Sequence, residues 1–171
     1  EIQKHLEKVG LPYNGSGIES SKITINKYDT NEILRKNGLL VAQHELVNIN
    51  DYKQDATKFI KDILSKFHFP FIAKPVDDGC SSAVKKVKNE EELRSFATLI
   101  FRQQEELSAI EASILNLKLK EEFPRKNQFL IEELIEKKDS SHFLEITGGM
   151  LTTLDDKGNC VYQVFEASEA L

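Results

Sequence analysis

The sequence has few of the residues that build disulfide-rich, proline-rich or membrane-spanning proteins. Its 171 residues include two cysteines, four prolines, eight glycines, one methionine and no tryptophan. Two cysteines without CxxC or Cys/His spacing exclude a disulfide framework and a zinc site, so both are expected to be thiols. The longest strongly apolar run, residues 69–73, is far shorter than the roughly 20 residues of a membrane span, and no signal-peptide pattern opens the chain. We therefore expect a cytoplasmic protein with no membrane partner.

Positive charge is also in the minority. The chain has 23 Lys and Arg residues against 28 Asp and Glu residues, a formal net charge of -5. Such a balance removes the long-range attraction to a phosphate backbone, so we expect no nucleic acid partner. The remaining composition, 40% hydrophobic and 30% charged, is typical of a globular domain with a real core. Because the chain begins at Glu1 and its one methionine is Met150, we expect a fragment of a longer protein.

Hydrophobic periodicity and turn residues predict helices interleaved with short strands. Helices are expected over 1–9, 18–27, 30–37, 52–67 and 90–119, the last as one helix or two consecutive ones. Strands are expected within 39–47 and over 69–75, 84–87 and 129–131, and a β-hairpin over 142–154 and 159–165 around an Asp-Asp-Lys-Gly turn. The pattern predicts an α+β fold with an antiparallel sheet and flanking helices.

A polar loop over residues 76–83 is the first candidate site. It follows a strand that ends with Lys74, and it offers backbone N–H groups and small polar side chains from Gly79, Cys80, Ser81 and Ser82. One cation with several N–H groups suits a phosphate, although the loop matches neither the P-loop nor GxGxxG. By composition alone, an ordinary exposed turn is the better explanation. No histidine spacing supports Cys80 as an activated nucleophile.

The connector after the strand at 129–131 is the second candidate. A flat heterocycle could lie between its aliphatic side chains, but a solvated acidic loop explains the same residues better; they include Glu132, Glu133, Leu134 and Ile135. Asp139 could accept hydrogen bonds from ribose hydroxyls or simply begin a turn. Lys27, taken alone, is an ordinary surface lysine.

In this order along the chain, these segments closely resemble the ATP-grasp region of D-alanine-D-alanine ligases. The resemblance runs from Leu11 to about Ile135 and is carried by residues 11–17, 26–30 with 36–41, 71–75 with 79–82, 86–87 with 90–93, and 130–135. It implies an ATP-grasp lobe in which residues 1–12 are the tail of a preceding N-terminal domain. Residues 13–171 would then be the first ATP-grasp subdomain, with the second lobe outside this sequence.

The resemblance also implies roles for individual residues. Lys27 and Lys74 match the lysines that contact the phosphates and the adenine side of ATP, where fixed cations offset negative charge. The family's mobile loop, which closes over the phosphates, corresponds to Gly79, Ser81 and Ser82. The segment whose backbone reads adenine corresponds to Glu132, Glu133, Leu134 and Ile135, and the ribose-binding acid corresponds to Asp139.

Two residues depart from the family pattern. Cys80 stands where the family has a serine that helps to position the first substrate, and Ala83 replaces the last glycine of the loop. Both leave the amino-acid specificity open. The helical stretch from about 102 to 122 is also longer than the corresponding stretch of a usual ligase.

The reaction implied by the resemblance is an ATP-dependent ligation. ATP phosphorylates the carboxylate of one amino acid, and the amine of a second displaces phosphate; with D-alanine, the product serves peptidoglycan synthesis. The Mg²⁺ ligands and the acceptor site are expected beyond Leu171, so this fragment alone is expected to be inactive, and a homodimer would form through parts outside it. Two alternatives remain: a carboxylate-amine ligase for other amino acids, and a non-catalytic ATP-grasp binding module.

Overall fold

The computed structural model describes residues 2–118, 122–137 and 144–169. The chain divides into two compact units, one up to Leu134 and one from Ile135 onward, and each is described by itself. The predicted division into residues 1–12 and 13–171 remains a prediction.

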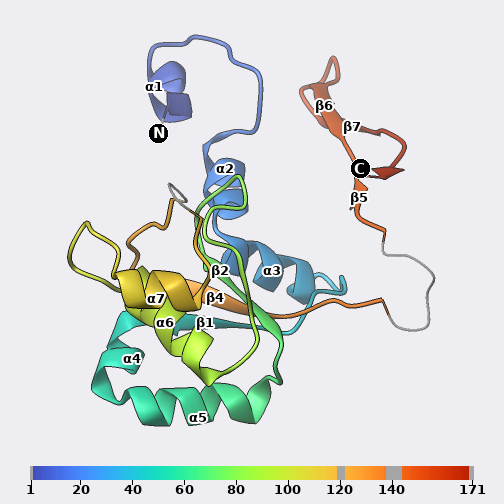
Figure 1. Cartoon of the computed structure of the whole chain (residues 1–171). Coiled ribbons are helices and arrows are strands. Elements are labelled where there is room, and N and C mark those ends of the chain that lie inside the picture. Colours follow the sequence, from blue (N-terminus) through green and yellow to red (C-terminus); the bar gives the residue numbers. More distant parts are fainter. Residues whose placement is uncertain (1, 119–121, 138–143, 170–171) are drawn as a thin grey trace. The chain divides into compact units, whose positions relative to one another are not determined.

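The first unit combines helices with a four-stranded antiparallel sheet (Figure 1). Its described helices are α1 (Ile2–Lys8), α2 (Ile18–Ile25), α3 (Lys27–Lys36), α4 (Ile49–Gln54), α5 (Ala56–Lys66), α6 (Glu90–Ile100) and α7 (Ala109–Ile114). Its strands are β1 (His44–Asn48), β2 (Phe71–Pro75), β3 (Lys85–Val87) and β4 (Gln128–Glu133), arranged in the order β1-β4-β2-β3. Every neighbouring pair in this sheet is antiparallel, which confirms the predicted α+β fold.

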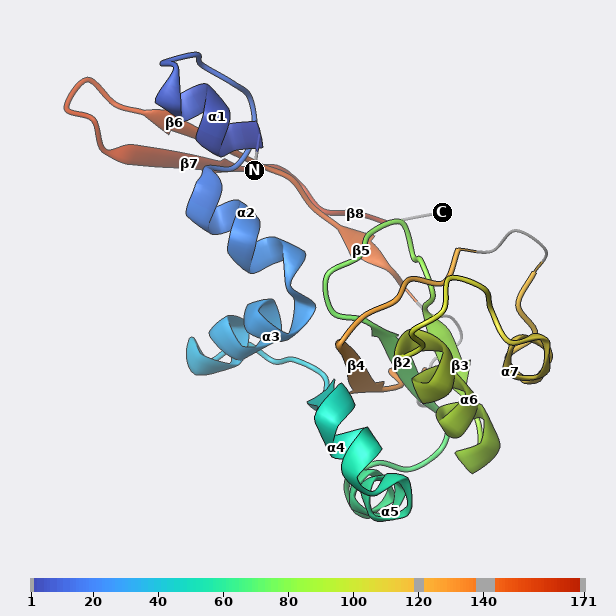
Figure 2. The ribbon, with the colours of Figure 1, turned by 90° about the vertical axis from the view of Figure 1, so that its left-hand side faces the viewer.

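One face of this sheet forms the core of the unit. Because side chains alternate between the faces of a strand, every second residue of the central strands points the same way. The core-facing residues are at most 2% exposed: Val47 of β1, Phe71 and Ala73 of β2, and Phe129 and Ile131 of β4. Apolar residues of α5 and α6 complete this core, and Figures 1 and 2 both show α5 beneath the sheet.

Side-chain caps move two helix starts away from their predicted places. α3 begins at Lys27 rather than Thr30 because the Asn26 side chain accepts a hydrogen bond from the Asp29 N–H at 3.1 Å. The helix predicted over 52–67 is divided into α4 and α5 at Asp55, whose carboxylate accepts from the Lys58 N–H at 2.9 Å. A cap thus outweighs continuous hydrophobic periodicity.

The predicted helical stretch 90–119 takes its two-helix form. Asn89 caps α6 by accepting a hydrogen bond from the Glu92 N–H at 2.9 Å. α6 ends at Ile100, and α7 begins only at Ala109 after a non-helical segment. Arg102 of this segment donates a hydrogen bond to the Phe123 carbonyl, on the chain that leads into β4.

The second unit consists of paired short strands. β6 (Met150–Leu154) and β7 (Cys160–Val164) form the predicted hairpin, and β5 (Ile146–Thr147) pairs with β8 (Ser168–Glu169). At the hairpin turn, the Asp155 carboxylate accepts hydrogen bonds from the N–H groups of Lys157 and Asn159, both at 2.8 Å. All residues of β6 and β7 are exposed.

No helix among the described residues is both long and apolar enough to cross a membrane.

Candidate functional site

The sheet face opposite the aromatic core carries two of the predicted binding residues. In the β2–β4 register, Lys74 lies opposite Leu130 and Ile72 lies opposite Glu132. Lys74 and Glu132 are therefore diagonal neighbours on the same face. They form an ion pair between Nζ and Oε2, and their side chains are only 20% and 14% exposed. A largely buried, oriented lysine is thus available on this face.

α3 completes the surroundings of this ion pair. The amide of Asn31 donates a hydrogen bond from Nδ2 to the other Glu132 oxygen, Oε1, at 2.8 Å. Lys27 is one helical turn earlier, so it shares a helix face with Asn31. Each oxygen of the Glu132 carboxylate has its own donor, which holds the carboxylate in one orientation.

Lys27 brings a second ammonium group close to Lys74. Its Nζ donates a hydrogen bond to the backbone carbonyl of Asp78. Burial and the positive charge of Lys74 lower the pKa of Lys27, while the carboxylates of Asp78, Asp77 and Glu132 act in the opposite direction. The two ammonium groups repel each other, and the nearby carboxylates compensate this repulsion only in part. A bound anion would reduce the repulsion further.

The loop between β2 and β3 has an unusual backbone. Cys80, Ser81 and Ala83 have φ values of 53°, 56° and 49°, in the left-handed region. The Ser82 N–H donates to the Gly79 carbonyl at 3.0 Å, which tightens the turn. Left-handed turns direct backbone N–H groups into an anion-binding concavity, and strained backbone of this kind clusters at ligand sites. Ala83, where the resemblance expects glycine, has the φ that favours glycine.

The loop also borders a hollow of about 510 Å³. The loop side of the hollow is lined by Asp78, Gly79, Cys80 and Ser82, and the facing side by Glu122, Phe123 and Pro124. Cys80 is exposed and is a free cysteine, as is Cys160, so the prediction of two thiols is confirmed. The thiol therefore faces open space beside the loop rather than the core.

The predicted adenine segment lies at the end of β4. Glu133 is the last residue of β4, is exposed, and donates its N–H to the Gln43 carbonyl at 2.8 Å. Leu134 follows as the half-buried end of the first unit, whereas Ile135 begins the second unit and is 65% exposed. Asp139 lies outside the described residues.

The structure therefore assembles part of the predicted set. Lys27, Lys74 and Glu132 lie close together, and Lys27 also contacts the loop at the Asp78 carbonyl. Their roles toward a ligand remain predictions. Sequence reasoning missed Asn31; the signal that could have identified it is its position four residues after Lys27 on one helix face.

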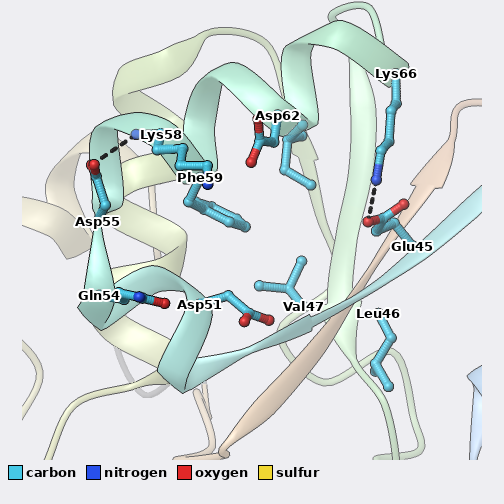
Figure 3. A pocket seen from close by; sticks show the side chains of 11 residues that line it. Glu45, Leu46, Val47, Asp51, Gln54, Asp55, Lys58, Phe59, Asp62 and Lys66 are labelled. Atoms are coloured by element: carbon cyan, nitrogen blue, oxygen red, sulfur yellow. Dashed lines mark hydrogen bonds and ion pairs between the residues drawn. The ribbon is translucent and has the colours of Figure 1, made fainter.

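A separate hollow of about 480 Å³ lies between α4, α5 and β1 (Figure 3). Three of its polar residues have structural partners: Asp55 caps α5, and Lys66 forms a 2.6 Å ion pair with Glu45. None of the predicted site residues lines it. Within the described ranges, no three His, Cys, Asp or Glu side chains are grouped so that they could hold a metal ion.

Comparison with known proteins identifies the family of the chain. The model of the family "D-ala D-ala ligase C-terminus" matches residues 33–146, more than half of the chain. A D-alanine-D-alanine ligase of Natranaerobius thermophilus is 36% identical over 92 residues, which cover 54% of this chain and 25% of the ligase. The chain spans about a quarter to a third of the length of the curated relatives it matches.

Solved structures show the same fold. The D-alanine-D-alanine ligase of Coxiella burnetii has a TM-score of 0.65 at 21% identity, covering 99% of this chain and 40% of that protein. The D-alanine-D-alanine ligase of Bacillus anthracis complexed with ATP has a TM-score of 0.55 at 23% identity, covering 96% of this chain and 47% of that protein. The family match, supported by this shared fold, shows that the chain belongs to the D-Ala-D-Ala ligase C-terminal family, an ATP-grasp family.

Proposed function

We propose that this chain is the ATP-binding part of a D-alanine-D-alanine ligase, which joins two amino acids through an acyl phosphate and releases ADP and phosphate. The observation that carries the proposal is the cluster of Lys27, Lys74 and Glu132 beside a left-handed loop, in a chain of this family.

The cluster suits the phosphates of ATP. Lys27 and Lys74 supply two fixed cations whose mutual repulsion a triphosphate would relieve. Gly79, Ser81 and Ser82 would add backbone N–H groups from the loop. Glu132 holds the Lys74 ammonium in place through an ion pair that is already formed without ligand. Little reorganisation of these side chains is then needed when ATP binds.

The nucleoside would lie at the end of β4. Glu132, Glu133, Leu134 and Ile135 would read adenine through the backbone, and Asp139 would accept hydrogen bonds from the ribose. Cys80 would help to position the first amino acid from the loop. These assignments come from the family resemblance.

The remaining machinery would come from beyond this chain. The relatives are three to four times as long as the matched part, so we propose that the second lobe, the Mg²⁺ ligands and the acceptor site are supplied there. Among the described residues, no three His, Cys, Asp or Glu side chains are grouped so that they could hold Mg²⁺. We propose a cytoplasmic enzyme of peptidoglycan precursor synthesis, and we expect this chain alone to bind ATP weakly and to be inactive.

The test is phosphate release by the full-length protein with MgATP and a panel of amino acids, D-alanine first. We expect release that requires D-alanine and is lost in Lys74→Ala. Lys61→Ala, a change at an exposed lysine of α5, is the matched control and should keep the wild-type rate. Release with D-alanine that survives in Lys74→Ala would contradict the assigned role of Lys74.

A ligase for a different amino acid is the second candidate, and Cys80 favours it. The thiol borders the hollow beside the loop, at the position where the resemblance expects a serine. Phosphate release with another amino acid, shifted toward D-alanine by Cys80→Ser, would support this candidate. No release with any amino acid, despite ATP binding, would support a non-catalytic binding module.

A further inference from the structure

Lys126, a residue outside the predicted set, forms ion pairs with Asp77 and Asp78 at the base of the loop. Its Nζ lies 2.8 Å from Oδ1 of Asp77 and 3.3 Å from Oδ1 of Asp78, the two residues that immediately precede Gly79. The Lys126 side chain is 24% exposed. The Asp78 side chain is 29% exposed and the Asp77 side chain 50%, so water screens the pair with Asp78 less than the pair with Asp77.

The backbone that carries Lys126 is anchored in the core. The Lys126 N–H donates to the carbonyl of Ile100, the fully buried last residue of α6, at 2.8 Å. The Arg102 guanidinium donates to the carbonyls of Leu99 and Phe123, both at 2.7 Å. Lys126 thus extends from an anchored backbone, so it can hold the base of the loop in place.

The two aspartates that Lys126 holds also affect the cation cluster. Both lie close enough to Lys27 to act on its pKa, and the Asp78 carbonyl accepts the Lys27 Nζ hydrogen bond. Without Lys126, the two carboxylates would compete with phosphate groups for Lys27 and would also repel the phosphate groups. Burial lowers the pKa of Lys126, but its hydrogen bond to Asp77 and the charges of both aspartates outweigh this and raise it. The ammonium therefore keeps its charge.

Asp78 gives a further sign that its orientation is imposed. Its Oδ2 atom is buried and has no hydrogen-bond partner among the described residues. A buried carboxylate oxygen without a donor is costly, so other interactions must keep it there. The ion pair to Oδ1 and the backbone bond to Lys27 are those interactions.

We propose that Lys126 is a positioning residue for nucleotide binding, which neutralises Asp77 and Asp78 and holds the base of the loop so that Lys27 and the loop N–H groups face the phosphates together. The proposal rests on the proposed function and deepens it, because it explains how an exposed loop is kept ready for its ligand.

Steady-state kinetics of the full-length protein test the effect on nucleotide. We expect Lys126→Met to raise KM for ATP about tenfold, the factor of one lost charge-assisted hydrogen bond, with little change in kcat. Lys126→Arg should restore most of the affinity. Adding Asp77→Asn and Asp78→Asn to Lys126→Met should also lower KM again, which a merely structural role would not produce. An unchanged KM in Lys126→Met, or no recovery in the triple variant, would overturn the proposal.

Amide hydrogen exchange of the same proteins without nucleotide tests the effect on the loop. Peptides covering residues 77–84 should exchange several-fold faster in Lys126→Met than in wild type, while the control Lys61→Met leaves them unchanged. Unchanged exchange would overturn the proposal even if KM rises, because Lys126 would then act on the nucleotide directly.

The two experiments separate this inference from the proposed function. If the wild-type protein neither binds nor consumes ATP, the proposed function fails and the nucleotide role of Lys126 fails with it, while hydrogen exchange still decides whether Lys126 holds the loop. If wild type is an active ligase and Lys126→Met behaves like it, only this inference fails.

Discussion

The two faces of β4 use consecutive residues for opposite purposes. Phe129 and Ile131 are fully buried in the core, and the Phe129 ring lies 5.0 Å from that of Phe96 and 5.4 Å from that of Phe101. Glu132, the next residue, points to the other face and joins a network of charges and amides. A strand with a two-residue period can therefore separate stability from chemistry without a longer sequence.

The faces also differ in how they respond to change. The core face depends on volume, because a lost ring leaves a cavity that neighbours fill only in part. The opposite face depends on pairing, because removing one partner leaves a buried polar group unsatisfied, whereas replacing both costs less. Four substitutions test this difference, from the largest expected effect to the smallest.

Removing a ring from the core face should have the largest effect. Phe129→Ala should lower the free energy of unfolding of the first unit by about 3–5 kcal/mol, because a fully buried ring is lost from an aromatic cluster. Urea unfolding followed by circular dichroism measures this loss. Phe165→Ala, at a ring 50% exposed in the second unit, should leave that transition unchanged. A loss below about 1 kcal/mol for Phe129→Ala would contradict the central place of this ring.

Removing one charge from the opposite face should cost less. Glu132→Gln should destabilise the protein by about 2 kcal/mol, since Lys74 then stays largely buried without its carboxylate and partial exposure reduces the full penalty. The double variant Lys74→Met with Glu132→Gln should recover most of this loss in the same urea experiment. Additive losses in the double variant would show that the two side chains are not coupled.

Asn31, the neutral partner of Glu132, should contribute less to the free energy of unfolding than Glu132 does. Asn31→Ala should destabilise the protein by about 1 kcal/mol, the typical value of a single hydrogen bond, and should raise KM for ATP several-fold in the full-length enzyme because Glu132 is less firmly oriented. Asn37→Ala is the matched control, since its amide donates to Ile33 within the same helix, and it should leave KM unchanged. Equal KM values in both variants would remove Asn31 from the site.

The pH dependence of α3 should show the smallest effect. A bidentate hydrogen bond from Arg35, together with the Arg35 charge and the contact with His44, lowers the pKa of Glu32 from 4.5 to about 2. Because this pKa is lower in the folded state, its contribution to stability is complete above about pH 4.5 and is lost as the pH falls toward 2.

Urea unfolding of wild type and Glu32→Gln over this range measures the contribution. The two proteins should differ at pH 6 and should converge as the pH approaches 2. A difference that stays constant down to pH 2 would show that ionisation of Glu32 is not its source.

Local patterns predicted much of the fold. The strands predicted over 69–75 and 84–87 are found as β2 and β3, and the predicted hairpin is found around Asp155. Alternation and turn residues predict such elements because they act over a few neighbouring positions. Periodicity placed helix starts less well where Asn26 and Asp55 cap the chain. A cap depends on one side chain meeting one N–H group, which a repeating pattern does not reveal.

The candidate site was predictable only through its lysines and its loop. The order of motifs, through the family resemblance, predicts Lys27, Lys74, the loop and the end of β4 as binding residues. Their partners are distant in sequence: Asn31 meets Glu132 across 101 positions, and Lys126 meets Asp78 across 48. Lys126 belongs to no motif, and the only sequence signal for Asn31 is its place one helical turn after Lys27, so the partners of both could be assigned only after the strands were paired.

Residue types at short, regular spacing specify most of the secondary structure, the apolar stripes that become the core and the family to which the chain belongs. Which charged side chains form pairs depends on how the strands and helices pack. The antiparallel register of β2 with β4 makes Lys74 and Glu132 diagonal neighbours, and the end of α6 supports the segment from which Lys126 reaches the loop. Electrostatic interactions act through space between residues far apart in the chain, so their partners are known only once the chain has folded.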